Sequence, residues 1–288
     1  MTAAPGQQNP EQQDREQQDR EQQNKVRLAV VQLVVPVGDP EGNRRRLAET
    51  VEEHRDADLI VFPEMFVPGY DLAVVTERSD ELAEDAETGP TAVLVRELAA
   101  AHGVTIVVGF LERADDGGLC NSLLIAAPGA GLAVYRKSHL FPAELPVFEP
   151  GHELPVVHTP AGVLGPQICF EHAFPAIATT QALAGAEVLV IPSAVGADHE
   201  HLIEVRTRAR AQDNQLFAIA ANSNSPGFCG HSMVVDPKGR VLAAAGLEDT
   251  VLRTVLDLSE IPAERRREPS LGMGRPHLYL FGREEETR

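Results

Sequence analysis

Apolar runs alternate with amphipathic segments along the chain from residue 26 onward. VRLAVVQLVV, which starts at Val26, is rich in β-branched residues and predicts a buried strand. Residues 43–54 place Leu47 and Val51 at helical spacing among charged residues, which predicts a helix. The same patterns predict further strands at 58–63, 104–112, 119–129, 132–136, 162–168, 187–194 and 216–222, and further helices at 91–102, 175–184 and 200–213.

This order of elements is typical of an α/β protein whose sheets are covered by helices. Residues 231–246 predict a hairpin with a Pro-Lys-Gly turn at its centre. No clear boundary follows residue 25, so residues 26–288 predict a single domain. The helix at 200–213 is expected to carry three apolar residues along one side, namely Leu202, Val205 and Ala209.

The first 25 residues differ from the rest in composition. After MTAAPGQQNP they read EQQDR, EQQDR and EQQNK, a five-residue repeat with almost no apolar side chain. Such a segment buries too little surface to offset the entropy of ordering, so residues 1–25 predict a disordered tail outside the fold. A partner-binding or transiently helical arm is the alternative.

Composition and charge restrict the kinds of partner and compartment. The chain has 288 residues, 43% hydrophobic and only 5% aromatic, which predicts a core of Val, Leu, Ile and Ala. Its net charge of -18 opposes binding to nucleic acid or anionic membrane. The three cysteines, Cys120, Cys169 and Cys229, are odd in number and widely spaced, which favours free thiols. Because no apolar run could span a bilayer and no secretory signal is evident, we expect a cytoplasmic protein.

Three polar residues follow apolar strands, where loops of α/β folds form sites. Glu64 comes after LIVFP, Lys137 after LAVYR and Cys169 after VLGPQI. A carboxylate can take the proton of a thiol, the thiolate can attack an electrophilic carbon, and an ammonium can stabilise the oxyanion. Each residue alone has a structural explanation, because a lone Cys is usually a core residue and Glu or Lys commonly caps a helix or faces solvent.

The motifs around these residues indicate a family. LIVFPEMFVPGY, YRKSHLF and GPQICFEHAFP closely resemble the three catalytic motifs of the nitrilase superfamily, the carbon-nitrogen hydrolases, in the same order. The resemblance runs from about residue 26 to about residue 279. Four further stretches match: FEPG at 148–151, RAQDN at 210–214, GHSMVVDPKG at 230–239 and RPHLY at 275–279.

The resemblance implies a four-layer α-β-β-α sandwich that forms a homodimer or higher oligomer through its helical face, and a reaction without metal or cofactor. It implies Glu64 as general base, Lys137 as oxyanion stabiliser and Cys169 as nucleophile. Glu144, in FPAELPVF, matches a second glutamate that orients the lysine and the substrate nitrogen. The remaining expected oxyanion or substrate contacts are the backbone N–H of Phe170 and the side chains of Tyr70, Glu171 and His172.

Within the family, the aliphatic amidases are the branch that the chain resembles. FEHAFP after the cysteine resembles amidases more than nitrilases, which predicts hydrolysis of a small primary amide to a carboxylate and ammonia. Ala176 stands where many members have Glu, so a nitrilase, an N-carbamoyl amino acid hydrolase or a thiol-amide hydrolase stays open. Asp198, Glu200 and Glu204 suggest a cationic amino or guanidino tail on the substrate, although acids are favoured at a helix start in any case.

Three hypotheses outside this family compete with it. A metal hydrolase would use the cluster from Asp198 to His201, but His199 and His201 are two residues apart and point to different faces of a helix. An inactive binding scaffold predicts loss of a catalytic residue, and all of them are present. A Cys-His protease needs a histidine base, and nothing in the sequence pairs a histidine with Cys169.

Overall fold

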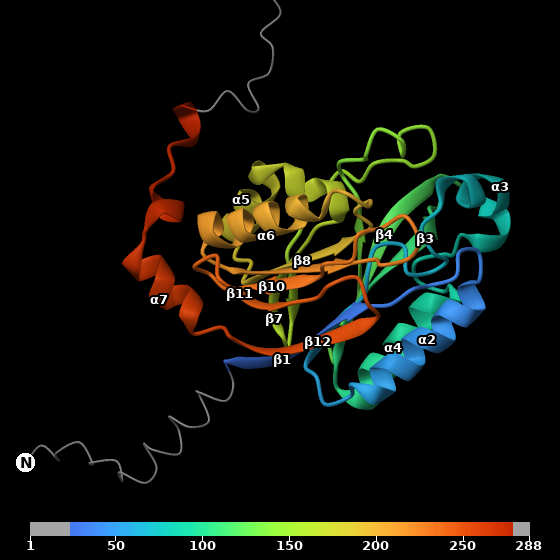
Figure 1. Cartoon of the computed structure of the whole chain (residues 1–288), viewed down its shortest axis with the longest axis horizontal. Helices are drawn as coiled ribbons and strands as arrows, with labels where there is room; N and C mark the ends of the chain where they lie inside the picture. The colour runs from blue at the N-terminus through green and yellow to red at the C-terminus, as the bar shows by residue number, and fades with distance from the viewer. Residues whose placement is uncertain (1–23, 279–288) are drawn as a thin grey trace, which may run out of the picture.

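The computed structural model describes residues 24–278 and contains two six-stranded sheets that face each other (Figure 1). The predicted tail, residues 1–25, lies outside the described residues except for Asn24 and Lys25, and Lys25 already begins the first strand. Tyr279, the last residue of the RPHLY stretch, also lies outside them. Among the described residues, no helix has the length and apolar character needed to cross a bilayer.

The first sheet has the order β12-β1-β2-β3-β4-β5, and the second has the order β11-β10-β9-β8-β7-β6. The strands of the first sheet are β1 (Lys25–Gln32), β2 (Leu59–Val61), β3 (Thr105–Arg113), β4 (Leu119–Ala127), β5 (Gly131–Arg136) and β12 (Thr250–Asp257). Those of the second are β6 (Val157–Thr159), β7 (Gly162–Pro166), β8 (Val188–Ser193), β9 (Phe217–Asn222), β10 (Met233–Val235) and β11 (Val241–Ala244).

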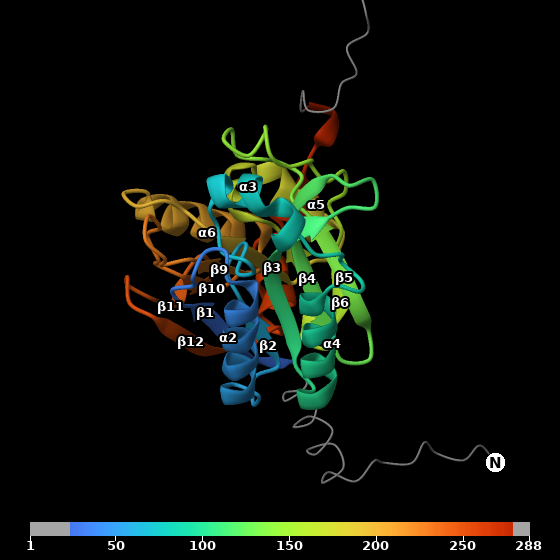
Figure 2. The ribbon, with the colours of Figure 1, turned by 90° about the vertical axis from the view of Figure 1, so that its right-hand side faces the viewer.

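Helices cover the outer face of each sheet. Figure 2 shows α2 and α4 side by side against the first sheet, and Figure 1 shows α5 and α6 over the second. This arrangement confirms the predicted α-β-β-α sandwich. The helices are α2 (Pro40–Glu53), α3 (Leu72–Leu82), α4 (Pro90–His102), α5 (Pro175–Leu183), α6 (Glu200–Asn214) and α7 (Glu260–Arg267), with short 3-10 turns η1 (Cys169–Ala173), η2 (Ser270–Met273) and η3 (Pro276–Leu278).

The central strands are continuous apolar runs because both of their faces are buried. On β1, Leu28 and Val30 point toward the second sheet, where they join a core that includes Val190 of β8. Ala29 and Val31 alternate with them and pack under the helices. The inter-sheet core therefore fixes how the strand ends of one sheet lie opposite those of the other.

Strand directions bring the predicted site residues to one edge. β2 and β3 are parallel, β4 runs against β3, and β5 runs against β4, so β2 and β5 point the same way. Glu64 and Lys137, which follow β2 and β5, therefore leave the first sheet at the same edge. β7 lies between β6 and β8 in the facing sheet and leads to Cys169.

The buried side of α6 differs from the prediction. Val205 is 63% exposed, and the residues that face the interior include Ile203, Thr207 and Arg210. The prediction followed apolar side chains, but this helix buries a polar stripe against the turn that carries Cys169. Its buried Arg210 donates from Nε to the carbonyl of His172, which explains why a charged residue faces inward.

Candidate active site

Glu64 is the central acceptor of a buried polar cluster. It follows β2 and is only 2% exposed. Its Oε1 accepts hydrogen bonds from Lys137 Nζ at 2.8 Å and from Asn121 Nδ2 at 2.7 Å. Its Oε2 is buried and has no partner among the described residues. Burial, together with the nearby Glu144 charge, raises the pKa of Glu64, although Lys137 and Asn121 oppose the rise. One carboxylate oxygen is thus held in place and the other is free to accept a proton.

Lys137 lies between two carboxylates. Its Nζ is 2.8 Å from Glu64 Oε1, 3.0 Å from Glu144 Oε1 and 2.9 Å from Glu144 Oε2, and the side chain is 1% exposed. Burial alone would lower the pKa of Lys137, but the charges of Glu64, Cys169 and Glu144 raise it above its ordinary value. The lysine therefore stays an ammonium and serves as a fixed positive charge.

Glu144 is held by four donors from different parts of the chain. Oε1 accepts from Tyr70 Oη at 2.9 Å, from Asn121 Nδ2 at 3.0 Å and from Lys137 Nζ at 3.0 Å. Oε2 accepts from the backbone N–H of Phe141 at 2.7 Å. The predicted pairing of Glu144 with the lysine is present, and Tyr70, an expected substrate contact, is bonded to this carboxylate.

Asn121 is a member of the cluster that was not predicted from the sequence. It is fully buried on β4, and its single amide nitrogen donates to both Glu64 and Glu144. An asparagine inside the apolar run LCNSLLIAA was the available signal, because a buried polar side chain needs partners. Asn121 sets the separation of the two carboxylates that flank the lysine.

Cys169 begins η1, three residues after Pro166, the last residue of β7. Its φ is +46°, a left-handed backbone conformation that non-glycine residues rarely adopt and that is common at functional turns. The residue is half-buried. Burial raises the pKa of the Cys169 thiol well above its ordinary value, Glu64 raises it further, and Lys137 opposes the rise. The resting sulfur is therefore a thiol that needs a base, and Glu64 acts on it electrostatically.

Phe170 and Glu171 follow the cysteine but lie in different surroundings. The Phe170 ring makes edge contacts with Phe141 at 5.4 Å and Phe174 at 5.2 Å between centroids, so the three rings form one aromatic cluster.

Glu171 is fully buried, and its Oε1 accepts from Ser138 N at 2.8 Å. Its Oε2 accepts from Ile168 N at 2.6 Å. Because both oxygens are occupied by protein donors, a substrate contact at Glu171 does not fit, and the residue instead ties the lysine loop to the cysteine turn.

His172 is 1% exposed and contacts an arginine that was not predicted from the sequence. Arg206 NH1 lies 3.0 Å from His172 Nε2. Burial, followed by the charges of Arg206, Arg210 and Lys137, lowers the pKa of His172 to about 3. His172 is therefore neutral near neutral pH. Arg206 lies four residues before Arg210, at helical spacing, which was the only sequence signal for it.

Two of the acids proposed to bind a cationic tail, Glu200 and Glu204, line a cavity of about 440 Å³ together with His201 and His231, and none of the predicted catalytic residues lines it. Asp198 and Glu200 are exposed, and Glu204 pairs with Arg208 at 2.9 Å. In the same segment His199 Nδ1 is bonded to the carbonyl of Ala197. Within residues 24–278, no group of three or more His, Cys, Asp or Glu side chains is arranged to hold a metal ion.

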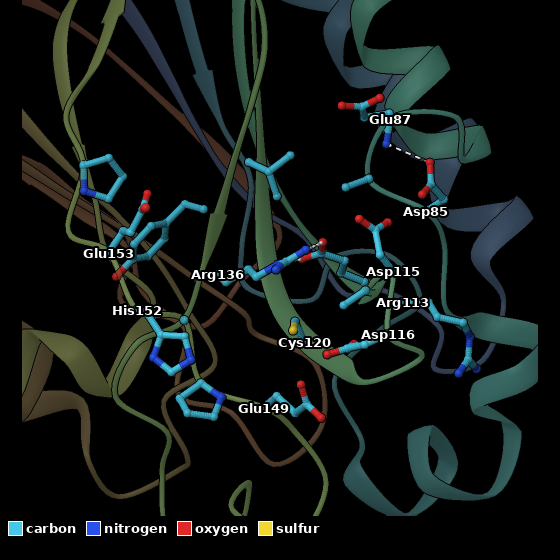
Figure 3. A pocket seen from close by; sticks show the side chains of 18 residues that line it. Asp85, Glu87, Arg113, Asp115, Asp116, Cys120, Arg136, Glu149, His152 and Glu153 are labelled. Carbon is cyan, nitrogen blue, oxygen red and sulfur yellow. Dashed lines mark hydrogen bonds and ion pairs between the residues drawn. The ribbon is translucent and has the colours of Figure 1, made fainter.

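One cavity borders the cluster at Tyr70, and another lies apart from it. One of about 790 Å³ ends at Tyr70, whose ring makes an edge contact with Phe228 at 5.7 Å between centroids. Another, of about 630 Å³, is shown in Figure 3 and is lined by Cys120, Arg136 and several acids. Arg136 is bonded there to Glu112, at 2.6 Å from NH2 to Oε1. None of the predicted site residues lines this second cavity, so it is separate from the site.

The sequence matches the family model for carbon-nitrogen hydrolase over residues 27–266. The chain therefore belongs to the carbon-nitrogen hydrolase family, within the nitrilase superfamily that its motifs indicated. It is 36% identical over 261 residues to a Pseudomonas protegens protein described as "Hydrolase in pqqF 5'region", covering 88% of this chain and 90% of that protein. It is 31% identical to the 2-oxoglutaramate amidase of Bacillus subtilis, over 88% of this chain and 98% of that one.

The fold agrees with solved structures of the same superfamily. A CN-hydrolase superfamily protein of Xanthomonas campestris superposes with a TM-score of 0.79 and 26% identity, covering 87% of this chain and 97% of that one. That protein was solved with an arsenic adduct in its active site. Fold and family together identify a hydrolase of carbon-nitrogen bonds, and its similarity to a named amidase supports amide hydrolysis.

Proposed function

We propose that the protein is a cysteine-dependent amidase that converts a small aliphatic primary amide to a carboxylate and ammonia. The observation that carries the proposal is the buried Lys137 between Glu64 and Glu144, with one Glu64 oxygen left without a partner among the described residues. A base, a fixed cation and a thiol that needs deprotonation are the parts that acyl transfer through a thioester requires.

The first half of the reaction forms the thioester. Glu64 takes the Cys169 proton on its free oxygen, and the sulfur attacks the amide carbon. Lys137 and the backbone N–H of Phe170 stabilise the resulting oxyanion. Glu64 then gives its proton to the amide nitrogen, the C–N bond breaks, and ammonia leaves.

The second half releases the acid. Glu64 takes a proton from a water molecule as the water oxygen attacks the thioester carbon. The tetrahedral oxyanion uses the same two donors, and the C–S bond breaks when it collapses. Glu64 returns the proton to the sulfur, which restores the resting thiol. Glu144 keeps Lys137 in position throughout, because both of its carboxylate oxygens lie within hydrogen-bond distance of Nζ.

An ammonia-release screen tests the reaction. The substrates are short aliphatic amides, the corresponding nitriles and N-carbamoyl amino acids, since a nitrilase and an N-carbamoyl hydrolase are the alternatives with the same cysteine chemistry. We expect release from amides, and release from nitriles alone would contradict the proposal. Cys169→Ala should abolish turnover while the circular dichroism spectrum stays unchanged, whereas Cys120→Ala should remain active. Absence of turnover on every substrate would favour an inactive scaffold.

We also propose a cytoplasmic homo-oligomer. Cys120, Cys169 and Cys229 are all free thiols, which supports a reducing compartment. Leu183 on α5 and Val205 on α6 are 61% and 63% exposed, so the helical face offers apolar side chains to a second copy. Light scattering on the purified protein measures the mass, and a monomer at micromolar concentration would contradict the oligomer.

A further inference from the structure

The cavity of about 790 Å³ that ends at Tyr70, called the Tyr70 cavity below, is walled by three segments of the chain. These are residues 34–37 after β1, residues 70–73 at the start of α3, and the loop at 225–228 after β9, with Arg46 of α2 beside them. Most of the side chains in the wall are apolar. Cavities of this size and character commonly hold small-molecule ligands.

Hydrogen bonds tie the walls to one another. The Val35 N–H donates to Ser225 Oγ at 3.0 Å, and the Gly38 N–H donates to the carbonyl of Pro68 at 2.9 Å. A Cβ on Gly69 would lie within 3.0 Å of the backbone of residues 36 and 37, so the first two segments are in close contact. The Tyr70 cavity is therefore held open by the fold itself.

The charged side chains of the wall are already bonded to the backbone. Asp71 Oδ1 accepts from the N–H groups of Ala73 at 2.9 Å and Val74 at 3.1 Å, which caps α3. Arg46 NH1 donates to the carbonyl of Val34 at 2.8 Å. One acid and one base together leave the cavity without a net formal charge, so it does not favour a charged ligand of either sign.

Apolar side chains in the wall are reached by water. Val34 is 37% exposed and Val37 is 41% exposed, and Leu72 and Phe228 are half-buried. A ligand chain that covered these side chains would remove apolar surface from water on both partners, which is favourable. The wall therefore selects for an apolar ligand.

Tyr70 connects the cavity to the lysine side of the site. Its Oη donates to Glu144 Oε1 at 2.9 Å, and Glu144 is bonded to Lys137. Burial, followed by the charges of Glu64, Glu144 and Cys169, raises the pKa of Tyr70 above its ordinary value. The ring that closes one end of the cavity thus lies in the field of the reacting groups.

Phe228 connects the cavity to the cysteine side. Its ring contacts that of Tyr70 at 5.7 Å between centroids, and its backbone pairs with Gly196 in a single β-bridge. Burial raises the pKa of the Cys169 thiol most, and the backbone N–H of Ala194, two residues before Gly196, is among the groups that lower it. Tyr70 and Phe228 therefore belong both to the cavity wall and to the surroundings of the site.

The reaction requires space for the acyl chain beside the sulfur. A primary amide loses only ammonia, so the rest of the substrate stays bonded to Cys169 in the thioester. The cavities around Cys120 and around His201 are lined by none of the predicted catalytic residues. The Tyr70 cavity adjoins the site and has an apolar wall, so it matches an acyl chain in both position and chemistry.

On these grounds, and resting on the proposed amidase activity, we propose that the Tyr70 cavity binds the acyl chain of the substrate. The preferred substrates are then aliphatic amides with an apolar chain of medium length, such as hexanamide. Val37 and Phe228 are specificity-determining residues, and the amide chemistry stays with Glu64, Lys137 and Cys169.

Matched amides test the cavity. Propionamide is too short to fill it, hexanamide extends the same chain, and ε-aminohexanamide and adipamate add an ammonium or a carboxylate at the chain end. The wild-type kcat/KM for hexanamide should exceed that for propionamide on the order of 10- to 50-fold, because each methylene leaves water. It should also exceed the values for both charged amides, since the apolar wall does not replace the hydration of a charge.

Val37→Asp tests the wall itself. The substitution places a carboxylate at an exposed turn, where it is compatible with the fold. It should lower the ratio of kcat/KM for hexanamide over propionamide on the order of tenfold, mainly through KM. It should also raise the kcat/KM for ε-aminohexanamide relative to hexanamide, an effect that a loss of stability alone would not produce.

Val93→Asp is the matched control, because Val93 on α4 is 37% exposed and does not line the cavity. It should leave both substrate ratios unchanged. A wild-type protein that does not distinguish hexanamide from propionamide, or that prefers either charged amide, would overturn the acyl cavity and leave the amidase proposal intact. An equal loss on hexanamide and propionamide in Val37→Asp would also overturn it.

Calorimetry on the Cys169→Ala protein measures the cavity without turnover. Hexanamide should bind on the order of tenfold more tightly than propionamide, with a more negative change in heat capacity. Equal affinity for the two amides would contradict the acyl cavity. If hexanamide binds more tightly but the wild-type protein releases no ammonia from it, the cavity stands and the amidase activity is wrong.

Discussion

The hydroxyl of Tyr135 donates a hydrogen bond of 2.7 Å to Oε1 of Glu171, and both side chains are buried. Tyr135 lies on β5, two residues before Lys137, and Glu171 lies in η1, two residues after Cys169. The bond therefore joins β5 of the first sheet to the turn that follows β7 of the second. It ties the strand that leads to Lys137 to the turn that carries Cys169, and acyl transfer needs reacting groups that are positioned in this way.

Removing the Glu171 carboxylate should loosen this connection. In Glu171→Gln the amide NH₂ replaces one acceptor and faces a donor, so the free energy of unfolding should fall by about 1–3 kcal/mol and kcat should fall with it. Tyr135→Phe removes one donor and leaves those of Ser138 and Ile168, so its cost should be smaller, about 1 kcal/mol. Urea unfolding and ammonia release measure the two effects. A Glu171→Gln protein with wild-type stability would contradict the positioning role.

Glu144→Gln should affect turnover more than substrate binding. The substitution removes one of the two carboxylate charges beside Lys137. It also turns one oxygen of the side chain into an NH₂ group, which cannot accept a hydrogen bond from Tyr70 or Asn121. We expect kcat to fall on the order of a hundredfold. Tyr70→Phe removes a single hydrogen bond to the same carboxylate and should cost on the order of tenfold. Steady-state kinetics on one amide measure kcat for the two variants. A smaller loss of kcat in Glu144→Gln than in Tyr70→Phe would contradict the prediction.

Thiol alkylation should report the base directly. The pKa of Glu64 is raised above its ordinary value of 4.5, so Glu64 becomes protonated, and stops accepting, at a pH above that of an ordinary glutamate. Alkylation of Cys169 by iodoacetamide should slow as the pH falls through this range. Glu64→Gln should slow it at neutral pH by about tenfold or more. Peptide mass spectrometry follows each cysteine separately.

Cys120 and Cys229 serve as internal controls in that experiment. They are 2% and 3% exposed, and burial raises the pKa of each thiol to about 11. Both should react slowly, with no dependence on residue 64. If Glu64→Gln leaves the alkylation rate of Cys169 unchanged, another group deprotonates the sulfur.

The cluster was predictable from sequence only where local patterns carry the information. Apolar runs followed by Glu64, Lys137 and Cys169 predicted that these three residues lie after strands. The motif resemblance then added Glu144 to the predicted site. Strand β12 was missed because its exposure changes along its length and Arg253 interrupts the apolar pattern. Asn121 and Arg206 were missed because their partners, Glu64 and His172, are 57 and 34 residues away in sequence, and only the fold brings them together.

Burial of His172 should make stability depend on pH. Its pKa is lowered to about 3 from an ordinary 6.5, so the unfolded chain binds a proton at this histidine that the folded protein does not. Stability is therefore full above pH 6.5 and is lost as the pH falls toward 3, with a slope of up to about 1.4 kcal/mol per pH unit. His172→Phe should reduce the slope of the unfolding free energy, measured with urea, between these pH values.

His158→Phe is the matched control for that slope, because His158 is exposed on β6. His54, whose pKa burial also lowers, is present in both proteins, so it does not contribute to the difference between them. An identical slope in wild type and His172→Phe would show that His172 does not titrate differently in the folded and unfolded states.

The pairing of β1 with β12 has a consequence for how the chain reaches its native state. Lys25 pairs with Asp257 and Gln32 pairs with Thr250, so the first strand lies beside the last strand of the sandwich. During synthesis, the outer edge of β1 stays without its partner until the residues of β12 have left the ribosome. The nascent protein thus exposes an open strand edge while all the elements between β1 and β12 are made, and β12 must pair rapidly once it emerges to avoid edge-to-edge association.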